Sequence, residues 1–156
     1  MINTYMFSNM TPQHGNFNRS IWARLEGYVR DWARLKGEVF VITGAVFDRD
    51  NDGARDTDDQ AHRMQSNNGD TRVAVPSHYY KIILAPRHDL FWDTISFLLP
   101  HQQQTQNNDA TLTNAIVSID QIEAMTGIDF LTAIAAQDAN REQVIEGFSA
   151  AGLWAR

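Results

Sequence analysis

Apolar residues recur every three or four positions between Asn18 and Lys36, and polar residues fill the positions between them. The apolar set is Ile21, Leu25, Tyr28, Trp32 and Leu35. On a helix this spacing draws one continuous apolar stripe. Gly37 follows at the place where a left-handed residue commonly ends a helix. The pattern therefore predicts an amphipathic helix from Asn18 to about Lys36.

Three later runs have the β-branched and aromatic composition that is typical of strands. They cover residues 38–47, 71–85 and 91–100. Pro76 lies inside the second run and predicts a break or a bulge there, because proline cannot donate a ladder hydrogen bond. A shorter aromatic run at residues 4–8 is also predicted to be a strand.

The C-terminal third combines polar connections with short helical patterns. Residues 101–115 are rich in Gln and Asn and predict an exposed connection. A short helix is expected between Ser118 or Asp120 as its cap and Gly127 as its stop, and a last helix at residues 140–150. Because strands and helices do not alternate as βαβ units, the order predicts a mixed α+β fold.

Composition limits these elements to one domain. The 156 residues are 43% hydrophobic, which suffices for one core, so residues 1–156 are interpreted as a single domain. No window approaches the roughly 18 apolar residues of a spanning helix, the start lacks a secretory signal pattern, and no membrane partner is expected. The absence of cysteine excludes disulfides, thiolate metal sites and a cysteine nucleophile. It leaves the compartment open, with a secreted or periplasmic location favoured.

The net charge of −6 is unevenly distributed. Six Asp and two Arg between Asp48 and Asp59 give −4, which leaves −2 for the rest of the chain. Five basic and two acidic residues between Asn18 and Lys36 give +3. The overall acidity therefore does not exclude a nucleic-acid partner, since phosphate binding depends on local Lys and Arg. The basic residues that this helix would offer to nucleic acid are Arg19, Arg24 and Arg30.

The acidic segment matches the spacing of a calcium-binding loop. Positions 1, 3, 5, 9 and 12 of that pattern are Asp48, Asp50, Asp52, Asp56 and Asp59. Gly53 occupies the turn position, where its bend would bring the Ala54 carbonyl onto the ion. We therefore predict a structural Ca²⁺ site in an insertion at about residues 48–59. The alternative is a solvated acidic loop, and the Asp at position 12 reaches less far than the usual Glu.

Six segments together carry the motifs of one nuclease family. In chain order they are Ser8-Asn9 with Pro12-Gln13, Asn18 with Trp22 to Glu26, VFVITGAVF, VAVPSHYYKIIL, FLLPHQ and VSIDQIEAMTGIDF. The set resembles the DNA/RNA non-specific endonucleases, the ββα-metal nucleases that include endonuclease G, over nearly the whole chain. The resemblance implies a ββα-metal nuclease fold, with an antiparallel sheet flanked by helices, of which this chain would be the C-terminal portion.

The resemblance also implies a magnesium-dependent or manganese-dependent phosphodiesterase that cleaves DNA and RNA with little sequence preference. Asn18 would be the single protein ligand of the metal, and Asn9 lines the same site in the family. Glu26 lies about 80° further around the helix, within reach of water on the metal, and Arg30 would steady phosphate charge one turn later. Apart from the resemblance, Asn18 is interpreted as a helix N-cap, and Glu26 with Arg30 as a surface ion pair.

The family's general-base motif, Asp-Arg-Gly-His, precedes the Ser-Asn strand and does not occur in these 156 residues. We expect the base histidine on a missing N-terminal segment or on a second chain. The alternative is a catalytically inactive module that binds nucleic acid or a protein partner. His14 is the histidine nearest in sequence to Asn18 and would be a substitute base. Lys81 is interpreted as an edge-strand lysine rather than a phosphate contact. A homodimer is also expected from the resemblance.

Overall fold

The structure is a computed structural model that describes residues 11–65, 72–87, 91–103 and 106–156. Its helices are α1 (Gly15–Phe17), the π-helical turn η2 (Asn18–Trp22), α2 (Ala23–Lys36), α3 (Asp109–Asn114), α4 (Ile119–Thr126), α5 (Thr132–Ala135) and α6 (Ala139–Glu146). Its strands are β1 (Phe40–Val46), β2 (Arg63–Gln65), β3 (Arg72–Ala74), β4 (His78–Pro86), β5 (Trp92–Pro100) and β6 (Ile116–Val117). Among the described helices, none combines the length and the apolar character that crossing a membrane requires.

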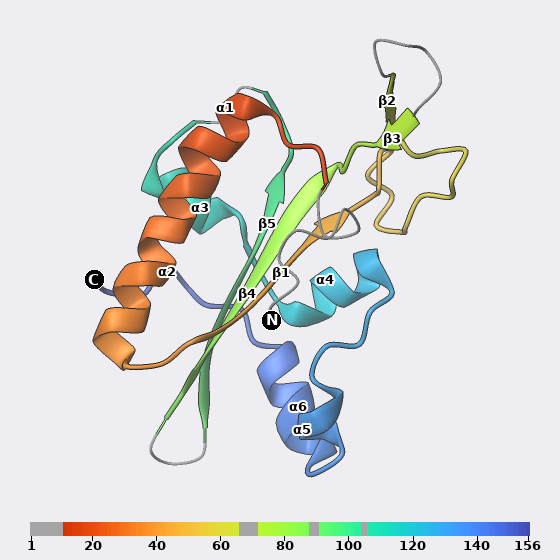
Figure 1. Ribbon diagram of the computed structural model, residues 1–156. Helices are drawn as coiled ribbons and strands as arrows, with labels where there is room; N and C mark the ends of the chain where they lie inside the picture. Colours follow the sequence, from red (N-terminus) through yellow and green to blue (C-terminus); the bar gives the residue numbers. More distant parts are fainter. Residues whose placement is uncertain (1–10, 66–71, 88–90, 104–105) are drawn as a thin grey trace, which may run out of the picture.

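The main sheet is antiparallel and has the strand order β1-β4-β5-β6. Strand β4 is therefore central, and Lys81 in its middle is paired with Thr43 of β1 on one side and Phe97 of β5 on the other. The long strands β4 and β5 run through the middle of the molecule (Figure 1). Strands β2 and β3 form a separate two-stranded sheet beyond the acidic loop.

Successive side chains of β4 point to opposite faces of the sheet, as the two-residue period of a strand requires. Tyr79 and Ile83 pack under α2, whereas Tyr80, Ile82 and Leu84 pack toward α4 and α6. The α2 side of the core includes Phe17, Ile21, Trp22, Leu25, Tyr28 and Trp32. The opposite side includes Ile119, Ile122, Leu131 and Ile145. The sheet thus lies between α2 on one face and α4 to α6 on the other (Figure 1).

The longer predicted elements are confirmed. The helix predicted from Asn18 continues to Lys36, and β1 and β5 occupy the strand runs at 38–47 and 91–100. The break predicted at Pro76 separates β3 from β4. Leu35, which the periodicity places on the apolar stripe, is 63% exposed. The strand predicted at residues 4–8 lies outside the described residues.

Helix α4 is bounded by the cap and the stop that the sequence offers. Ser118, rather than Asp120, is the N-cap, because its hydroxyl accepts the Gln121 N–H while the Gln121 side chain accepts the Ser118 N–H. Gly127 ends the helix with φ of 68°, a left-handed conformation that glycine adopts without a steric penalty.

Two C-terminal predictions were wrong. The segment 101–115, predicted as an exposed connection, contains helix α3, whose N-cap Asn108 accepts the Thr111 N–H at 2.8 Å. The last helix ends at Glu146 and does not continue to residue 150. The short elements β2, β3 and α5 were not predicted as separate elements. Each has only three or four residues, too few for a period to be visible.

Candidate functional site

The helical run begins earlier than predicted, and Asn18 is not its N-cap. His14 precedes the first helical residue, Gly15, and its carbonyl accepts the Asn18 N–H at 3.0 Å. Asn18 instead opens the π-helical turn η2 and exposes its side chain. Such wide turns occur often at functional sites, because they re-aim a side chain without ending the helix. The N-cap interpretation of Asn18 is therefore wrong.

Below this helix, a buried lysine approaches the face that carries Trp22. Lys81 is 6% exposed, and its ammonium lies 4.5 Å from the centre of the Trp22 ring and 2.9 Å from Thr43 Oγ1. Burial lowers the pKa of Lys81, and the nearby Glu26 carboxylate opposes that shift. The edge-strand interpretation of Lys81 is wrong because β4 is a central strand. Its partners come from a strand and a helix that the sequence alone does not place together.

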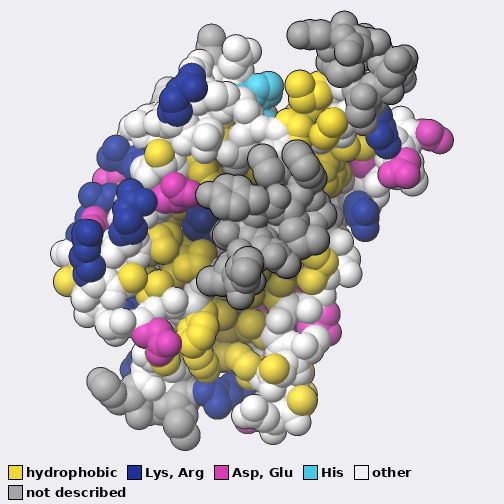
Figure 2. Space-filling view, in the orientation of Figure 1, with side chains coloured by type: hydrophobic (Ala, Val, Ile, Leu, Met, Phe, Trp, Pro, Cys, Tyr) yellow, Lys and Arg dark blue, Asp and Glu magenta, His cyan; other side chains and the backbone are white. Residues whose placement is uncertain are grey.

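Two of the predicted phosphate-binding arginines lie along the helix surface. The Arg19 guanidinium lies against the backbone of Gly15, and the Arg30 guanidinium lies near Gly27. Over the described ranges, neither arginine forms an ion pair, so the surface pair considered for Glu26 and Arg30 is not formed. Lys and Arg side chains gather along the edge of the molecule where α2 runs (Figure 2).

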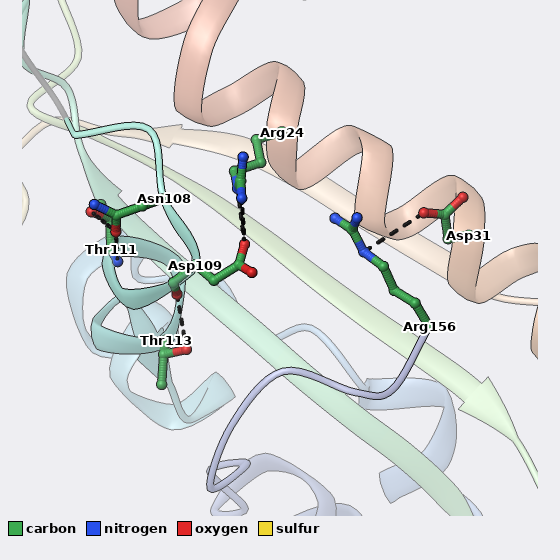
Figure 3. A network of polar contacts seen from close by, with 7 residues as sticks. All are labelled: Arg24, Asp31, Asn108, Asp109, Thr111, Thr113 and Arg156. Carbon is green, nitrogen blue, oxygen red and sulfur yellow. Dashed lines mark hydrogen bonds and ion pairs between the residues drawn. The ribbon is translucent and has the colours of Figure 1, made fainter.

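Arg24 is engaged on another side of the helix. Its guanidinium contacts the Asp109 carboxylate at 2.9 Å, which ties α2 to α3 (Figure 3). A hydrogen bond from Tyr28 and the Arg24 charge lower the pKa of Asp109. Arg156 pairs with Asp31 further along the same helix (Figure 3). A phosphate contact by Arg24 would therefore compete with Asp109. The remaining predicted site residue, Asn9, lies outside the described residues.

A cleft of about 500 Å³ opens between the start of α1 and the acidic loop. Its histidines are His14, His62, His78 and His101. The imidazole of His101 is held at both nitrogens, because Nδ1 lies 2.9 Å from the Pro76 carbonyl and Nε2 accepts the His14 N–H at 2.7 Å. The His14 ring, which the sequence offered as a substitute base, lies tilted against the His101 ring, with the ring centres 4.4 Å apart.

The buried His101 predicts a loss of stability in mild acid. Burial is the main cause that lowers its pKa below the ordinary value of 6.5. Protonation thus occurs more readily in the unfolded chain, so the stabilisation is complete above about pH 6.5 and is lost as the pH falls toward the folded-state pKa. In urea unfolding between pH 8 and pH 5, His101→Gln should flatten the pH dependence. The exposed-site control His62→Gln should leave it unchanged, and equal slopes in both variants would contradict the prediction.

The acidic loop is folded around the buried Asp48 carboxylate. Its two oxygens accept the N–H groups of Asp52 and Gly53, each at 3.1 Å. Asp56 accepts the Arg49 N–H at 2.9 Å and closes the loop. Gly53 adopts φ of 84°, which fits its predicted place at the turn. The loop is thus held in a defined shape by its own hydrogen bonds, in addition to its contacts with solvent.

Three of the predicted calcium ligands converge. Asp48, Asp50 and Asp56 each place a carboxylate oxygen within 4.8 Å of the others. Asp52 instead accepts the Ala54 N–H at 2.8 Å, and Asp59 lies in an exposed turn that follows. The converging carboxylates are acidic groups that are able to hold a metal, and the structure does not identify the ion.

Comparison with known protein families identifies the family of this chain. The family described as DNA/RNA non-specific endonuclease matches residues 1–137. The chain belongs to the DNA/RNA non-specific endonuclease family. The family predicted from the sequence motifs is thereby confirmed, and with it the expectation of a metal-dependent nuclease family, a class of hydrolases.

Relatives of this endonuclease chain are nucleases of fungi and animals. It is 35% identical to nuclease C1 of Cunninghamella echinulata var. echinulata over 133 aligned residues. The alignment covers 83% of the chain and 49% of the relative. It is 26% identical to mitochondrial endonuclease G of Bos taurus over 147 aligned residues. This alignment covers 94% of the chain and 47% of the relative. The chain thus spans about half the length of these relatives.

A solved structure confirms the fold of this chain. The EndoG chain in a crystal structure of the EndoG/EndoGI complex matches with a TM-score of 0.57 and 26% identity. The match covers 79% of this chain and 48% of that chain. The α+β fold with an antiparallel sheet flanked by helices, predicted from the sequence, is the fold observed.

Proposed function

We propose that the protein containing this chain is a magnesium-dependent nuclease that hydrolyses phosphodiester bonds of DNA and RNA with little sequence preference. The observation that carries the proposal is the placement of Asn18, exposed on a π-helical turn, in a chain of this endonuclease family. Glu26 and Arg30 follow on the same helix, eight and twelve residues later. The placement combines a neutral oxygen donor, a carboxylate and a guanidinium on one rigid element.

The residues present fit Mg²⁺ or Mn²⁺. In the described part of the chain, the Asn18 side chain makes no hydrogen bond, and its exposed amide oxygen is available as a hard ligand. Magnesium keeps several waters and needs few protein ligands. When bound, the ion would neutralise charge on the scissile phosphate. Glu26 would orient water beside Asn18, and Arg30 would bind a phosphate oxygen. The buried Lys81 ammonium interacts electrostatically with Glu26 from the sheet below.

The proposed reaction also needs a general base that activates water, which we expect from the family. The Asp-Arg-Gly-His motif expected for it would come from another segment or from a second chain. Nucleic acid would approach the basic edge of α2, where Arg19 is unpaired among the described residues and Arg24 would exchange Asp109 for phosphate. A homodimer remains part of the proposal.

Cleavage assays on supercoiled plasmid and on RNA test this function with the full-length protein. We expect cleavage with Mg²⁺ or Mn²⁺ and none with EDTA. Binding that is independent of metal and weakens with salt, without cleavage, would instead support the inactive nucleic-acid-binding module. Cleavage that persists in EDTA would overturn the metal-dependent mechanism.

We also propose that the acidic loop binds Ca²⁺. The convergence of Asp48, Asp50 and Asp56 supports this proposal, as does the left-handed Gly53 at the sharp turn. Calcium prefers several carboxylate and carbonyl oxygens. The Ala54 carbonyl and the Asp52 carboxylate belong to the same loop and are further candidate ligands. Reduced repulsion among the carboxylates would stabilise the insertion when the ion is bound.

The double variant Asp50→Asn with Asp56→Asn is expected to lower the number of bound calcium ions by one, because it removes two of the three converging charges. Isothermal titration calorimetry measures that number directly. Asp58→Asn is a matched control, since it removes an exposed carboxylate of the same loop at a position that is not a predicted ligand. An unchanged stoichiometry in the double variant would reject the loop as a calcium site.

A further inference from the structure

A second group of carboxylates lies on the opposite side of the sheet from α2. It comprises Asp120, Glu123, Asp129, Glu142 and Glu146, from α4, the segment after it, and α6. Two sets of three, Asp120 with Glu123 and Glu146, and Asp129 with Glu142 and Glu146, each place one oxygen per residue within 4.8 Å of one another. Glu146 belongs to both sets, so all five acids surround one side chain.

Glu146 is the buried member of this group, which we call the α4–α6 acidic cluster. Its side chain is 6% exposed, and its Oε1 has no hydrogen-bond partner among the residues that the structure describes. It follows Ile145 at the end of α6, and the packing of Ile145 against Ile119 and Ile122 draws this end of the helix toward α4. A buried carboxylate oxygen without a partner is costly, and it points to a group that completes its coordination.

The charged groups that act on Glu146 are all carboxylates, and a backbone hydrogen bond from Leu131 opposes their effect on its pKa. Burial, followed by the Glu123 and Glu142 carboxylates, raises the pKa of Glu146 to about 7. Among the described residues no Lys or Arg pairs with any acid of the cluster, although Asp31, Asp93 and Asp109 elsewhere all have basic partners. Like charges at this separation repel one another, and a bound cation would relieve that repulsion.

The positions of the acids are held by the backbone. One oxygen of Glu123 accepts the Phe130 N–H at 2.8 Å, which fixes that side chain between α4 and the following segment. The Asp120 carboxylate lies close to Gly147: its Oδ2 is 3.5 Å from the place that a Cβ would take on this glycine. Asp120 thus reaches the residue directly after Glu146. The carboxylates come from two helices, α4 and α6, and from the connection that follows α4.

We propose that the α4–α6 acidic cluster is a calcium site in which Glu146 is the central ligand. Five carboxylates offer up to ten oxygens, which suits the large, oxygen-rich and irregular coordination of Ca²⁺ better than the water-rich octahedron of Mg²⁺. The ion would join α4 to α6. This site is separate from the acidic loop, whose converging carboxylates lie beside β2 and β3 (Figure 1).

The test uses the full chain with the acidic loop silenced by Asp50→Asn and Asp56→Asn. In this background we expect calorimetry to show one calcium ion bound, and the melting temperature to rise by about 5 °C or more when calcium exceeds its Kd a hundredfold. Adding Glu146→Gln should weaken calcium binding at least about tenfold. Glu142→Gln, at a half-buried position of α6, should weaken it as well, and this second variant leaves the buried Glu146 intact.

Glu38→Gln is the matched control, because Glu38 is exposed and lies outside both acidic groups. It should bind calcium with unchanged affinity. At pH 8, above the Glu146 pKa of about 7, Glu146→Gln should also raise the melting temperature in EDTA, since it removes a buried charge from among like charges. No calcium binding in the loop-silenced chain, or equal binding by the Glu38, Glu142 and Glu146 variants, would overturn the site.

Discussion

Replacing Asn18 with alanine is expected to lower magnesium-dependent cleavage of plasmid DNA at least about 100-fold in kcat/KM. The exposed amide at the start of η2 is the proposed protein ligand of the metal, and alanine has no oxygen to replace it. Initial rates of the full-length protein, measured over a range of Mg²⁺ concentrations, test this expectation. A metal-ligand role predicts that more Mg²⁺ is needed for half-maximal activity.

Two further variants separate metal binding from folding of the helix start. Asn16→Ala removes an equally exposed amide two residues earlier and should retain full activity. Asn18→Asp restores an oxygen ligand and should recover part of the activity at high Mg²⁺. Equal activity of Asn18→Ala and the unaltered protein would remove Asn18 from the mechanism, and with it the proposed metal site.

Trp32→Ala is expected to destabilise the folded chain by about 3–5 kcal/mol. The Trp32 ring is 0% exposed, stacks on Phe97 and meets the Trp154 ring edge to face. It also donates its indole N–H to the Trp154 carbonyl at 3.2 Å. Alanine would leave a cavity between α2 and the sheet and an unpaired carbonyl. Urea unfolding of the full chain measures the change in the free energy of unfolding.

Leu35→Ala serves as the matched control on the same helix. Leu35 is 63% exposed, so its truncation should change the free energy of unfolding by no more than about 0.5 kcal/mol. The periodicity of the sequence assigns Trp32 and Leu35 to one stripe, whereas their burial differs completely. Similar losses in both variants would show that α2 packs differently from the structure.

The residues proposed for the site could be chosen from the sequence where they lie on one element. Asn18, Glu26 and Arg30 belong to one helix, and a helix fixes the spacing of residues that are close in sequence. Within the acidic loop, the same local logic identified Asp48, Asp50 and Asp56 as neighbours. The same spacing also predicted Asp52 as a ligand, but its carboxylate accepts the Ala54 N–H instead. Spacing does not predict this hydrogen bond, because it depends on the backbone conformation of the turn.

Parts that depend on distant segments were not predictable from spacing. Lys81 comes under Trp22 only because β4 is the central strand and faces α2, a consequence of sheet order. The ion pair of Arg24 with Asp109 joins residues 85 positions apart. The α4–α6 acidic cluster is likewise invisible in the sequence, because its acids are scattered among ordinary surface residues and only Glu146 is buried.

By itself the sequence determined the α2 helix, the strands β1, β4 and β5, the capping of α4, the family and the candidate residues on each local element. These features follow from backbone periods, turn chemistry and motifs, which act over a few residues. The tertiary structure alone decided the sheet order, the start of the helical run before Asn18, the burial of Lys81 and Glu146, and the partners of Arg24. These features depend on which faces pack together, because burial is a property of the whole fold and not of any one segment.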